Sequence, residues 1–310
     1  MKHTEQSLVY SHDVNRTLKI HLPIVALEST VLTHGLPQPQ NLQLARDMER
    51  AVRENGATPA TIAFLDGEIH VGLTDSELER LANEKDVYKV GPRDFGTMIV
   101  EGASGGTTVA GTMLACKRAE LKVFATGGIG GVHREAPFDI SADLQALATI
   151  PMIVVCAGAK AILDLPATLE YLETMSVPVV GYGTDDFPAF YSPKSGLGVS
   201  KSLDTPQDVV EFAKAHWSTG LQSAVLVANP VPAADGIPQS EMEPHIEQAN
   251  REAREKEIHG KELTPFLLKR ISELTKGKSM QANLSLLLNN ARLAAQIAVA
   301  MRTAERRRQA

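Results

Sequence analysis

Short apolar runs alternate along the chain with longer stretches in which apolar residues recur every three to four positions. The apolar runs cover residues 24–27, 61–65, 122–125, 153–157, 179–182 and 224–228. Runs of this length predict strands buried on both faces, whereas the stretches between them, such as 42–55 and 75–83, predict helices. The alternation therefore predicts an α/β fold, a three-layer α/β/α sandwich around a mostly parallel, mixed central sheet.

The C-terminal part of the chain is predicted to be helical. Residues 265–308 read as two helices broken near Gly277, and the second is rich in Leu and Ala. Its wide apolar face suits packing against the body of the protein or a neighbouring subunit. The polar segment 242–261 predicts an exposed, charged helix. No repeat, low-complexity tract or long linker divides the sequence, which favours one domain over residues 21–310 after an N-terminal extension, residues 1–20.

Composition narrows the class of protein. The 310 residues are 43% hydrophobic and 22% charged, which is typical of a soluble globular chain with a sizeable core. A formal net charge of -6 gives no general cationic field for nucleic acid, so a nucleic-acid partner is not expected.

Three further observations bear on where the protein resides. The cysteines Cys116 and Cys156 lie in apolar surroundings without metal-binding spacing, which predicts reduced thiols in a cytoplasmic protein. The first residues lack the apolar core of a signal peptide. No stretch approaches the ~20 apolar residues of a membrane span, so no membrane partner is expected.

Lys160 follows directly on the apolar run 153–159. Because an ammonium at the end of a buried strand is costly to desolvate, its pKa tends to fall and the free amine becomes a nucleophile able to form a Schiff base. The alternative is a lysine that extends from the strand end into water. Spacing alone favours that alternative.

Glu28 also follows directly on an apolar run, 24–27. Burial at a strand end would raise its pKa towards the range of a general acid. The structural alternative is that Glu28 caps a helix or forms a salt bridge at the strand end. The residues alone do not decide between this role and that of a general acid.

Two glycine-rich runs suggest anion-binding backbone. Residues 102–112 combine glycines with hydroxyl side chains before a helix, an arrangement that favours phosphate, although the Gly-Lys-Ser/Thr ending of a Walker loop is missing. Residues 126–134 superficially match a dinucleotide fingerprint, but His133 stands where Gly or Ala is needed. NAD binding is therefore disfavoured.

Asp139 and Asp143 are four residues apart, a spacing that would place both carboxylates on one face of a helical turn. Oxygen ligands of this kind suit Mg²⁺ or Mn²⁺ with water in the remaining positions. The alternative is a helix start at which Ser141 is the cap and Asp143 favours the dipole. Two carboxylates alone are a weak metal signature.

Several rare strings occur in one order: residues 26–30, 34–37, 39–41, 125–133, 139–144 and 156–160. Together they closely resemble the pseudouridine-5'-phosphate glycosidase family, which includes the indigoidine synthase A proteins. The likeness begins near Pro23 and continues through 227–230, 264–268 and 283–291.

The resemblance implies reversible cleavage of the C–C glycosidic bond of pseudouridine 5'-phosphate, giving uracil and ribose 5-phosphate. It implies that Lys160 attacks the anomeric carbon while Glu28 acts as general acid towards the ring oxygen, giving a ring-opened covalent adduct. Protonation of the uracil carbon then permits cleavage to an iminium, which water hydrolyses. Lysine suits this role because its adduct can become an iminium.

The resemblance also implies one Mn²⁺ per subunit with Asp139 in the metal position, and a homotrimer. It leaves open whether Asp139 or Asp143 contacts the metal more directly. Lys89 is implied to pair with the substrate phosphate and Val109 to contribute its backbone. The remaining implied substrate contacts are Thr126, His133, Ser141, Ala142, Asp143 and Asn283.

Two other functions use the same residues. A different Schiff-base enzyme, such as a sugar-phosphate lyase or aldolase, would employ Lys160 on another substrate, and uracil release separates it from a glycosidase. A non-catalytic sugar-phosphate-binding protein would use Lys160 only as a phosphate partner. Such a protein would give no borohydride-trapped adduct with ribose 5-phosphate.

Overall fold

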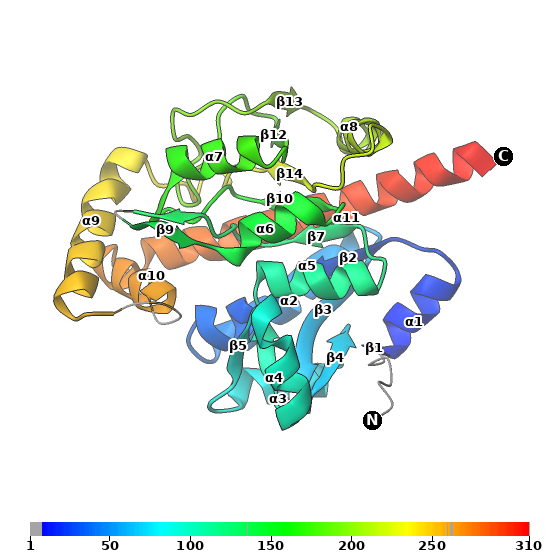
Figure 1. Ribbon diagram of the computed structural model, residues 1–310, viewed down its shortest axis with the longest axis horizontal. Helices are drawn as coiled ribbons and strands as arrows, with labels where there is room; N and C mark the ends of the chain where they lie inside the picture. The colour runs from blue at the N-terminus through cyan, green and yellow to red at the C-terminus, as the bar shows by residue number, and fades with distance from the viewer. Residues whose placement is uncertain (1–7, 135, 259, 261–262, 310) are drawn as a thin grey trace.

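The computed structural model describes residues 8–134, 136–258, 260 and 263–309. Figure 1 shows a large twisted sheet with helices on both faces. The sheet has eleven strands in the order β1-β4-β3-β2-β7-β10-β14-β12-β13, with β6 added beside β3 and β5 beside β6. These strands are β1 (Leu8–Tyr10), β2 (Ile24–Leu27), β3 (Thr58–Leu65), β4 (Glu68–Val71), β5 (Tyr88–Val90), β6 (Gly105–Thr107), β7 (Val123–Ala125), β10 (Ile153–Cys156), β12 (Val179–Tyr182), β13 (Lys201–Leu203) and β14 (Val225–Ala228).

The sheet is mostly parallel, as the apolar runs predicted. From β3 through β2, β7, β10 and β14 to β12 and β13, every neighbouring pair is parallel. Only β4 and β6 run antiparallel to β3, so the sheet is mixed at that side. Because β2, β7, β10 and β14 point the same way, their carboxyl ends share one edge, where α/β sheets place ligands.

Two helical layers cover the sheet. On one face α11 packs on α2, α8 and strands β2, β7 and β10, and on the other α5 packs on α6, which packs on α7. The helices are α1 (His12–Lys19), the π-helix η1 (Val31–Gly35), α2 (Gln40–Glu54), α3 (Asp75–Asn83), the 3-10 helix η2 (Pro92–Asp94), α4 (Phe95–Glu101), α5 (Val109–Arg118), α6 (Ala142–Thr149), α7 (Leu165–Thr174), α8 (Pro206–Ser218), α9 (Gln239–Glu255), α10 (Leu263–Leu274) and α11 (Lys278–Gln309). The predicted three-layer sandwich with C-terminal helices is confirmed.

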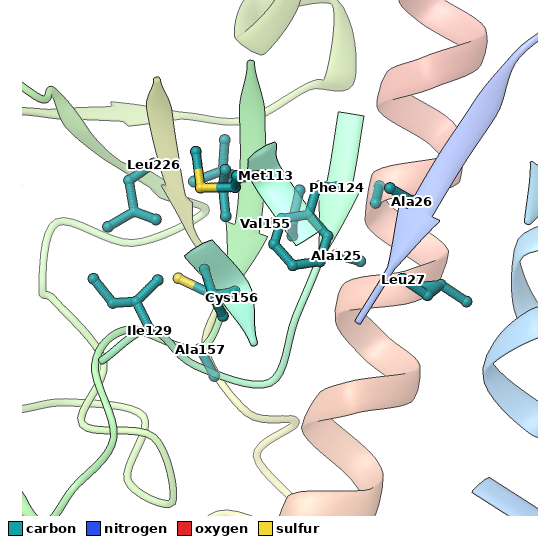
Figure 2. Packing of buried hydrophobic residues seen from close by; sticks show 14 of the residues in the cluster. Ala26, Leu27, Met113, Phe124, Ala125, Ile129, Val155, Cys156, Ala157 and Leu226 are labelled. Carbon is teal, nitrogen blue, oxygen red and sulfur yellow. The ribbon is translucent and has the colours of Figure 1, made fainter. Parts of the chain in front are cut away.

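The core between these layers fixes where the strand ends lie. Figure 2 shows Leu27, Phe124, Val155 and Leu226 from four neighbouring strands together with Met113 of α5. All five side chains are buried. Since full burial of a large apolar side chain stabilises a fold by about 1.5–3 kcal/mol, this layer holds the carboxyl edge firmly in register. Both cysteines are buried and unpaired, as predicted.

The C-terminal helices follow the predicted break. Gly277 lies between α10 and α11 with a positive φ of 85°, a conformation that glycine adopts without strain. Over Lys278–Ala304, α11 is the one helix in the described residues that is long and apolar enough to span a membrane, which the sequence reading did not anticipate. Because 61% of its most apolar stretch is buried inside the protein, α11 is a core helix.

The prediction of an exposed helix over 242–261 is wrong in part. Helix α9 buries Met242, Ile246, Ala249 and Ala253 along one face and packs on α10. These four residues recur at intervals of three or four, so one stripe of an otherwise charged helix is apolar. Residues 259, 261 and 262 of the predicted helix lie outside the described residues.

The N-terminal segment joins the sheet. Strand β1 pairs in parallel with β4, and α1 packs on β2 and β3. Residues 8–20 of the predicted extension are thus part of the layered structure, and residues 1–7 lie outside the described residues. The boundary placed at residue 21 stays a prediction.

A second, three-stranded antiparallel sheet lies beyond the carboxyl edge of the large one. Its strands are β8 (Val132–His133), β9 (Ala136–Ile140) and β11 (Leu163–Asp164), in the order β11-β8-β9. Strand β9 forms the edge, and its Phe138 side chain is 98% exposed. We call β8, β9 and β11 the small sheet.

Candidate active site

A cavity that is partly open to solvent lies at the carboxyl ends of β2 and β7 and is bounded by α10 and α11. Its ionisable and amide lining comprises Glu28, His34, Lys89, Lys160 and Asn283. Its apolar wall comprises Val31, Phe190, Pro265, Leu268 and Leu287. Four residues that the sequence singled out therefore meet in one cavity: Glu28, Lys89, Lys160 and Asn283. A cavity with an apolar wall and a few convergent polar groups is typical of a small-molecule site.

Glu28 is the first residue after β2, and its side chain is half-buried at the cavity. Burial raises the pKa of this carboxyl, while the Lys160 ammonium and the hydrogen bond from Thr126 oppose the rise. Thr126 Oγ1 donates a hydrogen bond to Oε1 of Glu28. A carboxyl with a raised pKa stays protonated to higher pH than a free glutamate, which is the property of a general acid.

Lys160 lies in the loop of residues 157–162 between β10 and β11, which we call the Lys160 loop, rather than on strand β10 itself. The strand ends at Cys156, and Gly158 then adopts a φ of 83°. A Cβ at Gly158 would lie 2.0 Å from the carbonyl oxygen of Pro188, so the turn towards Lys160 requires glycine. Lys160 is half-buried, and within the described part of the chain its ammonium forms no hydrogen bond or ion pair. The amine is therefore available to a ligand.

The loop of residues 126–131, which we call the glycine loop, separates Glu28 from Lys160. It bonds to Glu28 through Thr126 and to the Lys160 loop through three backbone hydrogen bonds. These run from Ala157 N to Gly127 O at 2.9 Å, from Ile129 N to Gly158 O at 3.1 Å and from Lys160 N to Ile129 O at 3.1 Å. Gly127 and Gly128 line the cavity, so the predicted proximity of this backbone to a ligand agrees with the geometry.

The glycines in this loop are required by close packing. A Cβ on Gly128 would lie 2.6 Å from the ring of Phe190. One on Gly130 would lie 2.2 Å from Ser141 Oγ. Because real Cβ atoms do not approach neighbours so closely, side chains at these two positions would push the loop away from Phe190 or from α6.

Ser141 and Asp143 adopt the structural alternative. Ser141 is the N-cap of α6 and accepts a hydrogen bond from the Asp143 backbone, and Asp143 is buried. Asp143 Oδ1 accepts from Ala110 N at 2.9 Å and its Oδ2 accepts from Gly130 N at 2.8 Å. This carboxylate joins the start of α5 to the glycine loop. Ala142, the first residue of α6, is exposed.

The expectation that Asp139 and Asp143 share one face of a helical turn is wrong. Asp139 lies on β9 and Asp143 lies in α6, with the cap residue Ser141 between them. The cap ends the strand geometry, so a spacing of four residues does not bring the two side chains onto one helical face. Asp139 is exposed, whereas both oxygens of Asp143 already accept backbone N–H groups.

Asp139 and His133 are the groups with which the small sheet could bind a cation. Burial lowers the pKa of His133, opposed by the Asp139 carboxylate, and the ammonium groups of Lys160 and Lys89 lower it further. A neutral imidazole is the form that binds metals. No cluster of three or more His, Cys, Asp and Glu side chains suited to a metal occurs among the described residues. This donor set fits a water-rich Mn²⁺ or Mg²⁺ site and does not fit a closed protein cage.

The two predicted phosphate contacts differ in their relation to the cavity. Lys89, on β5, lines the cavity, whereas Val109 is buried and is not part of its lining. Val109 is the first residue of α5, where Ala110 N donates to Asp143 and Gly111 N donates to the cap Thr108. Among the described residues the Val109 amide has no acceptor, which leaves this N–H for an anion at the helix N-terminus.

Several lining residues escaped the sequence reading. Phe190 stands in the long connection between β12 and β13, where no apolar run or motif marks it. Thr30 follows Glu28 and Ser29, and its hydroxyl is buried without a partner in the described structure. His34 also lines the cavity. Its position in one of the strings that carry the family resemblance, a few residues after Glu28, was the sequence feature that could have identified it.

Comparisons with known proteins agree on one family. Residues 13–300 match the family model described as indigoidine synthase A like protein. The chain is 50% identical over 291 residues to a pseudouridine-5'-phosphate glycosidase of Caldanaerobacter subterraneus, covering 93% of this chain and 95% of that protein. It is 54% identical over 288 residues to a protein of the same name from Solibacter usitatus, covering 92% of this chain and 96% of the other.

Two solved structures have the same fold. An indigoidine synthase A-like protein from Thermotoga maritima superposes with a TM-score of 0.89 at 35% identity, covering 97% of this chain and 99% of that one. The prealnumycin C-glycosynthase AlnA, solved in complex with ribulose 5-phosphate, superposes with a TM-score of 0.90 at 38% identity. That alignment covers 98% of this chain and all of the other, given as 100%.

Proposed function

The chain belongs to the indigoidine synthase A-like family, and from this premise we propose that it is a pseudouridine-5'-phosphate glycosidase. The proposed reaction is reversible cleavage of the C–C glycosidic bond to give uracil and ribose 5-phosphate. One observation carries the proposal: Glu28 and Lys160 face a common cavity and are both bonded to the glycine loop between them.

The first step opens the sugar ring. The unprotonated amine of Lys160 attacks the anomeric carbon, and the bond from that carbon to the ring oxygen breaks. The ring oxygen takes a proton from Glu28, whose pKa burial raises. Since Thr126 already donates to Oε1, Oε2 remains to carry that proton. The product is a ring-opened adduct in which nitrogen and uracil share one carbon.

The second step releases uracil. The cationic nitrogen of the adduct returns a proton to the Glu28 carboxylate, and this carboxyl then protonates the uracil carbon. The C–C bond breaks, its electron pair stays with uracil, and the lone pair of the Lys160 nitrogen forms a C=N bond. The resulting iminium accepts water, and the amine departs as ribose 5-phosphate forms. An oxygen nucleophile could not supply this lone pair as effectively, which is why the role requires lysine.

The polar and apolar parts of the lining suit different parts of this substrate. Lys89 and the free Val109 amide offer charge and an N–H to the phosphate. Asn283, 8% exposed on α11, offers an amide to the base, and Phe190 and Leu287 offer apolar contact. In the proposal Thr126 and His133 complete the contacts near the sugar.

The proposal includes one Mn²⁺ per subunit, held by Asp139 with His133 nearby and water as the remaining ligands. When bound, the ion supplies positive charge to the oxygens of the substrate. It further includes a homotrimer in the cytoplasm. The exposed Phe138 and Ile140 offer apolar surface to a neighbouring subunit, and the unpaired buried thiols suit a reducing compartment.

The test mixes the purified protein, Mn²⁺ and pseudouridine 5'-phosphate and measures uracil by chromatography. We expect uracil release by the wild-type protein and its loss in Lys160→Ala. The matched variant Lys160→Arg keeps a positive charge but has no Schiff-base chemistry, so it should be equally inactive. Borohydride should trap ribose 5-phosphate on the wild type alone. Retained uracil release in Lys160→Ala would refute the mechanism.

A further inference from the structure

A pair of buried asparagines that are not part of the cavity lining is bonded to the glycine loop. Asn290, on α11, is fully buried, and Asn229, directly after β14, is 6% exposed. Asn290 Nδ2 donates to the carbonyl oxygen of Thr126 at 2.8 Å and to that of Gly127 at 3.4 Å. Asn229 Nδ2 donates to Asn290 Oδ1 at 2.9 Å. The side-chain amide of Asn290 is therefore satisfied at both ends.

The same pair reaches the strand that leads to Lys160. The backbone N–H of Asn229 donates to the carbonyl of Cys156, the last residue of β10, at 2.8 Å. Asn229 thus ties the end of β10 to Asn290, and Asn290 ties α11 to the first two carbonyls of the glycine loop. Buried amides are costly to leave unpaired, so these bonds define one arrangement of the three segments.

The hydrogen bonds described between the segments of the proposed acid and the proposed amine pass through the glycine loop. Thr126 donates to Glu28 from one end of the glycine loop, and Ile129 accepts from the Lys160 backbone near the other. Gly127 O accepts from both Ala157 N and Asn290 Nδ2. A shift of the Thr126–Gly127 peptide would therefore move Glu28 and the Lys160 loop relative to each other.

We propose that Asn290 and Asn229 are positioning residues that set the separation between the Glu28 carboxyl and the Lys160 amine. This inference rests on the proposed function and adds residues that touch neither the substrate nor the cavity. The asparagines bond to the Thr126 end of the glycine loop, whereas the start of α5 with Val109 reaches its other end indirectly, through Ala110, Asp143 and Gly130. Loss of the asparagines therefore affects the chemical step more than phosphate recognition.

The central test compares Asn290→Ala with Asn289→Ala. Asn289 is the preceding residue of the same helix, and its amide donates to the carbonyl of Pro230 at 3.2 Å, away from the glycine loop. With pseudouridine 5'-phosphate as substrate, we expect kcat of Asn290→Ala to fall by about 10- to 100-fold, because displacements of about 1 Å at reacting groups cost that much. KM should change by less than about threefold, and Asn289→Ala should retain wild-type values.

The pH profile separates positioning from general loosening. The hydrogen bond from Thr126 lowers the pKa of Glu28, so a displaced Thr126 lets that pKa rise. Since the acid is active when protonated, the alkaline limb of the kcat profile should move to higher pH in Asn290→Ala. Thr126→Val should produce a shift in the same direction. When residue 126 is already valine, Asn290→Ala should lower kcat by a smaller factor than it does in the wild type. Both substitutions act on the hydrogen bond from Thr126 to Glu28.

Asn229→Ala keeps the test decisive if Asn290→Ala does not fold. It removes the anchor of Asn290 Oδ1 but leaves both donations to the glycine loop, so we expect a fall in kcat of roughly 10-fold with KM unchanged. A folded variant of either asparagine with wild-type kcat and an unshifted alkaline limb would overturn the inference. So would a rise in KM that matches the fall in kcat. Uracil release by the wild type is measured first, so failure of the proposed function shows separately.

Discussion

The large sheet, whose strand ends form the cavity, and the small sheet beyond them are built differently. On the side of the large sheet, Glu28, Thr126 and Asn290 are joined by buried hydrogen bonds that reach from β2 to α11. In the small sheet, Asp139 is exposed on an edge strand, which among the described residues pairs with β8 alone. The contrast teaches that the proposed acid and the backbone that carries the proposed amine are held by hydrogen bonds before substrate arrives. The groups proposed to hold the ion keep contact with water.

The largest expected effect comes from Glu28→Gln, which removes the proton donor and keeps the shape. We expect uracil release to fall by about 10²–10⁴-fold, the usual contribution of a positioned acid. Glu49→Gln is the matched control: Glu49 is also buried with a pKa raised by burial, yet it bonds to Thr61 and Arg53, away from the cavity. Equal losses in the two variants would contradict the assignment of Glu28 as the acid.

The same variant predicts a pH-dependent stability. Because the folded-state pKa of Glu28 lies above its unfolded value, the contribution of Glu28 to stability is present at low pH and is lost as pH rises from about 4.5 through the folded value. Glutamine cannot ionise, so the melting temperature of Glu28→Gln relative to the wild type should increase between pH 5 and pH 8. Thermal unfolding at both values measures this. A melting-temperature difference between Glu28→Gln and the wild type that is the same at pH 5 and pH 8 would contradict a pKa of Glu28 raised by burial.

Asp139→Asn probes the water-facing side. Removing one charge from a site with few protein ligands should raise the Mn²⁺ concentration for half-maximal activity roughly tenfold, which corresponds to about 1.4 kcal/mol. Activity at saturating Mn²⁺ and the pH profile set by Glu28 should stay near wild type. The titration of activity with Mn²⁺ tests this, and an unchanged half-saturation would remove Asp139 from the metal site.

The smallest expected effect concerns Arg134, which joins the end of β8 to the loop that carries Lys160 and to α9. Arg134 directly follows β8 in the chain. Its guanidinium donates to the carbonyls of Ala161 at 3.1 Å and Leu163 at 3.2 Å and pairs with Glu243 of α9. Arg134→Lys keeps the charge but cannot span both carbonyls and Glu243, so the Lys160 loop loses one or two bonds. We expect kcat to fall by a few-fold, consistent with about 0.5–1.5 kcal/mol per bond. Steady-state uracil release measures the change, and full activity would show that the Lys160 loop is held without Arg134.

The sequence predicted the buried strands well and the short ones poorly. Runs such as 24–27 and 153–156 consist of apolar residues because both faces of the sheet are covered, and that composition is visible in one dimension. Strand β6 is Gly105–Thr107 and strand β8 is two residues long, so neither has a side-chain pattern that could reveal it. The same holds for β1, which forms because β4 offers it a free edge.

The site was predictable to the extent that it follows strand ends. Glu28 was identified by its place after β2, and Lys160 by its place beyond β10. Asp139 and Asp143 were misplaced because a spacing of four residues suits a helix, while Ser141 begins α6 between them. Asn290 and Thr126 are separated by 164 residues, so their hydrogen bond depends on tertiary structure that no local pattern shows.

The tight packing of the glycine loop has a consequence for divergence within the family. Positions 128 and 130 accept no side chain without moving Phe190 or α6, so mutation there has few viable outcomes. The apolar wall formed by residues such as Val31 and Leu268 carries no comparable constraint, since it bonds to none of the reacting groups. Substitutions along that wall should therefore change which base is joined to the sugar carbon. The residues proposed to open the sugar ring should stay the same.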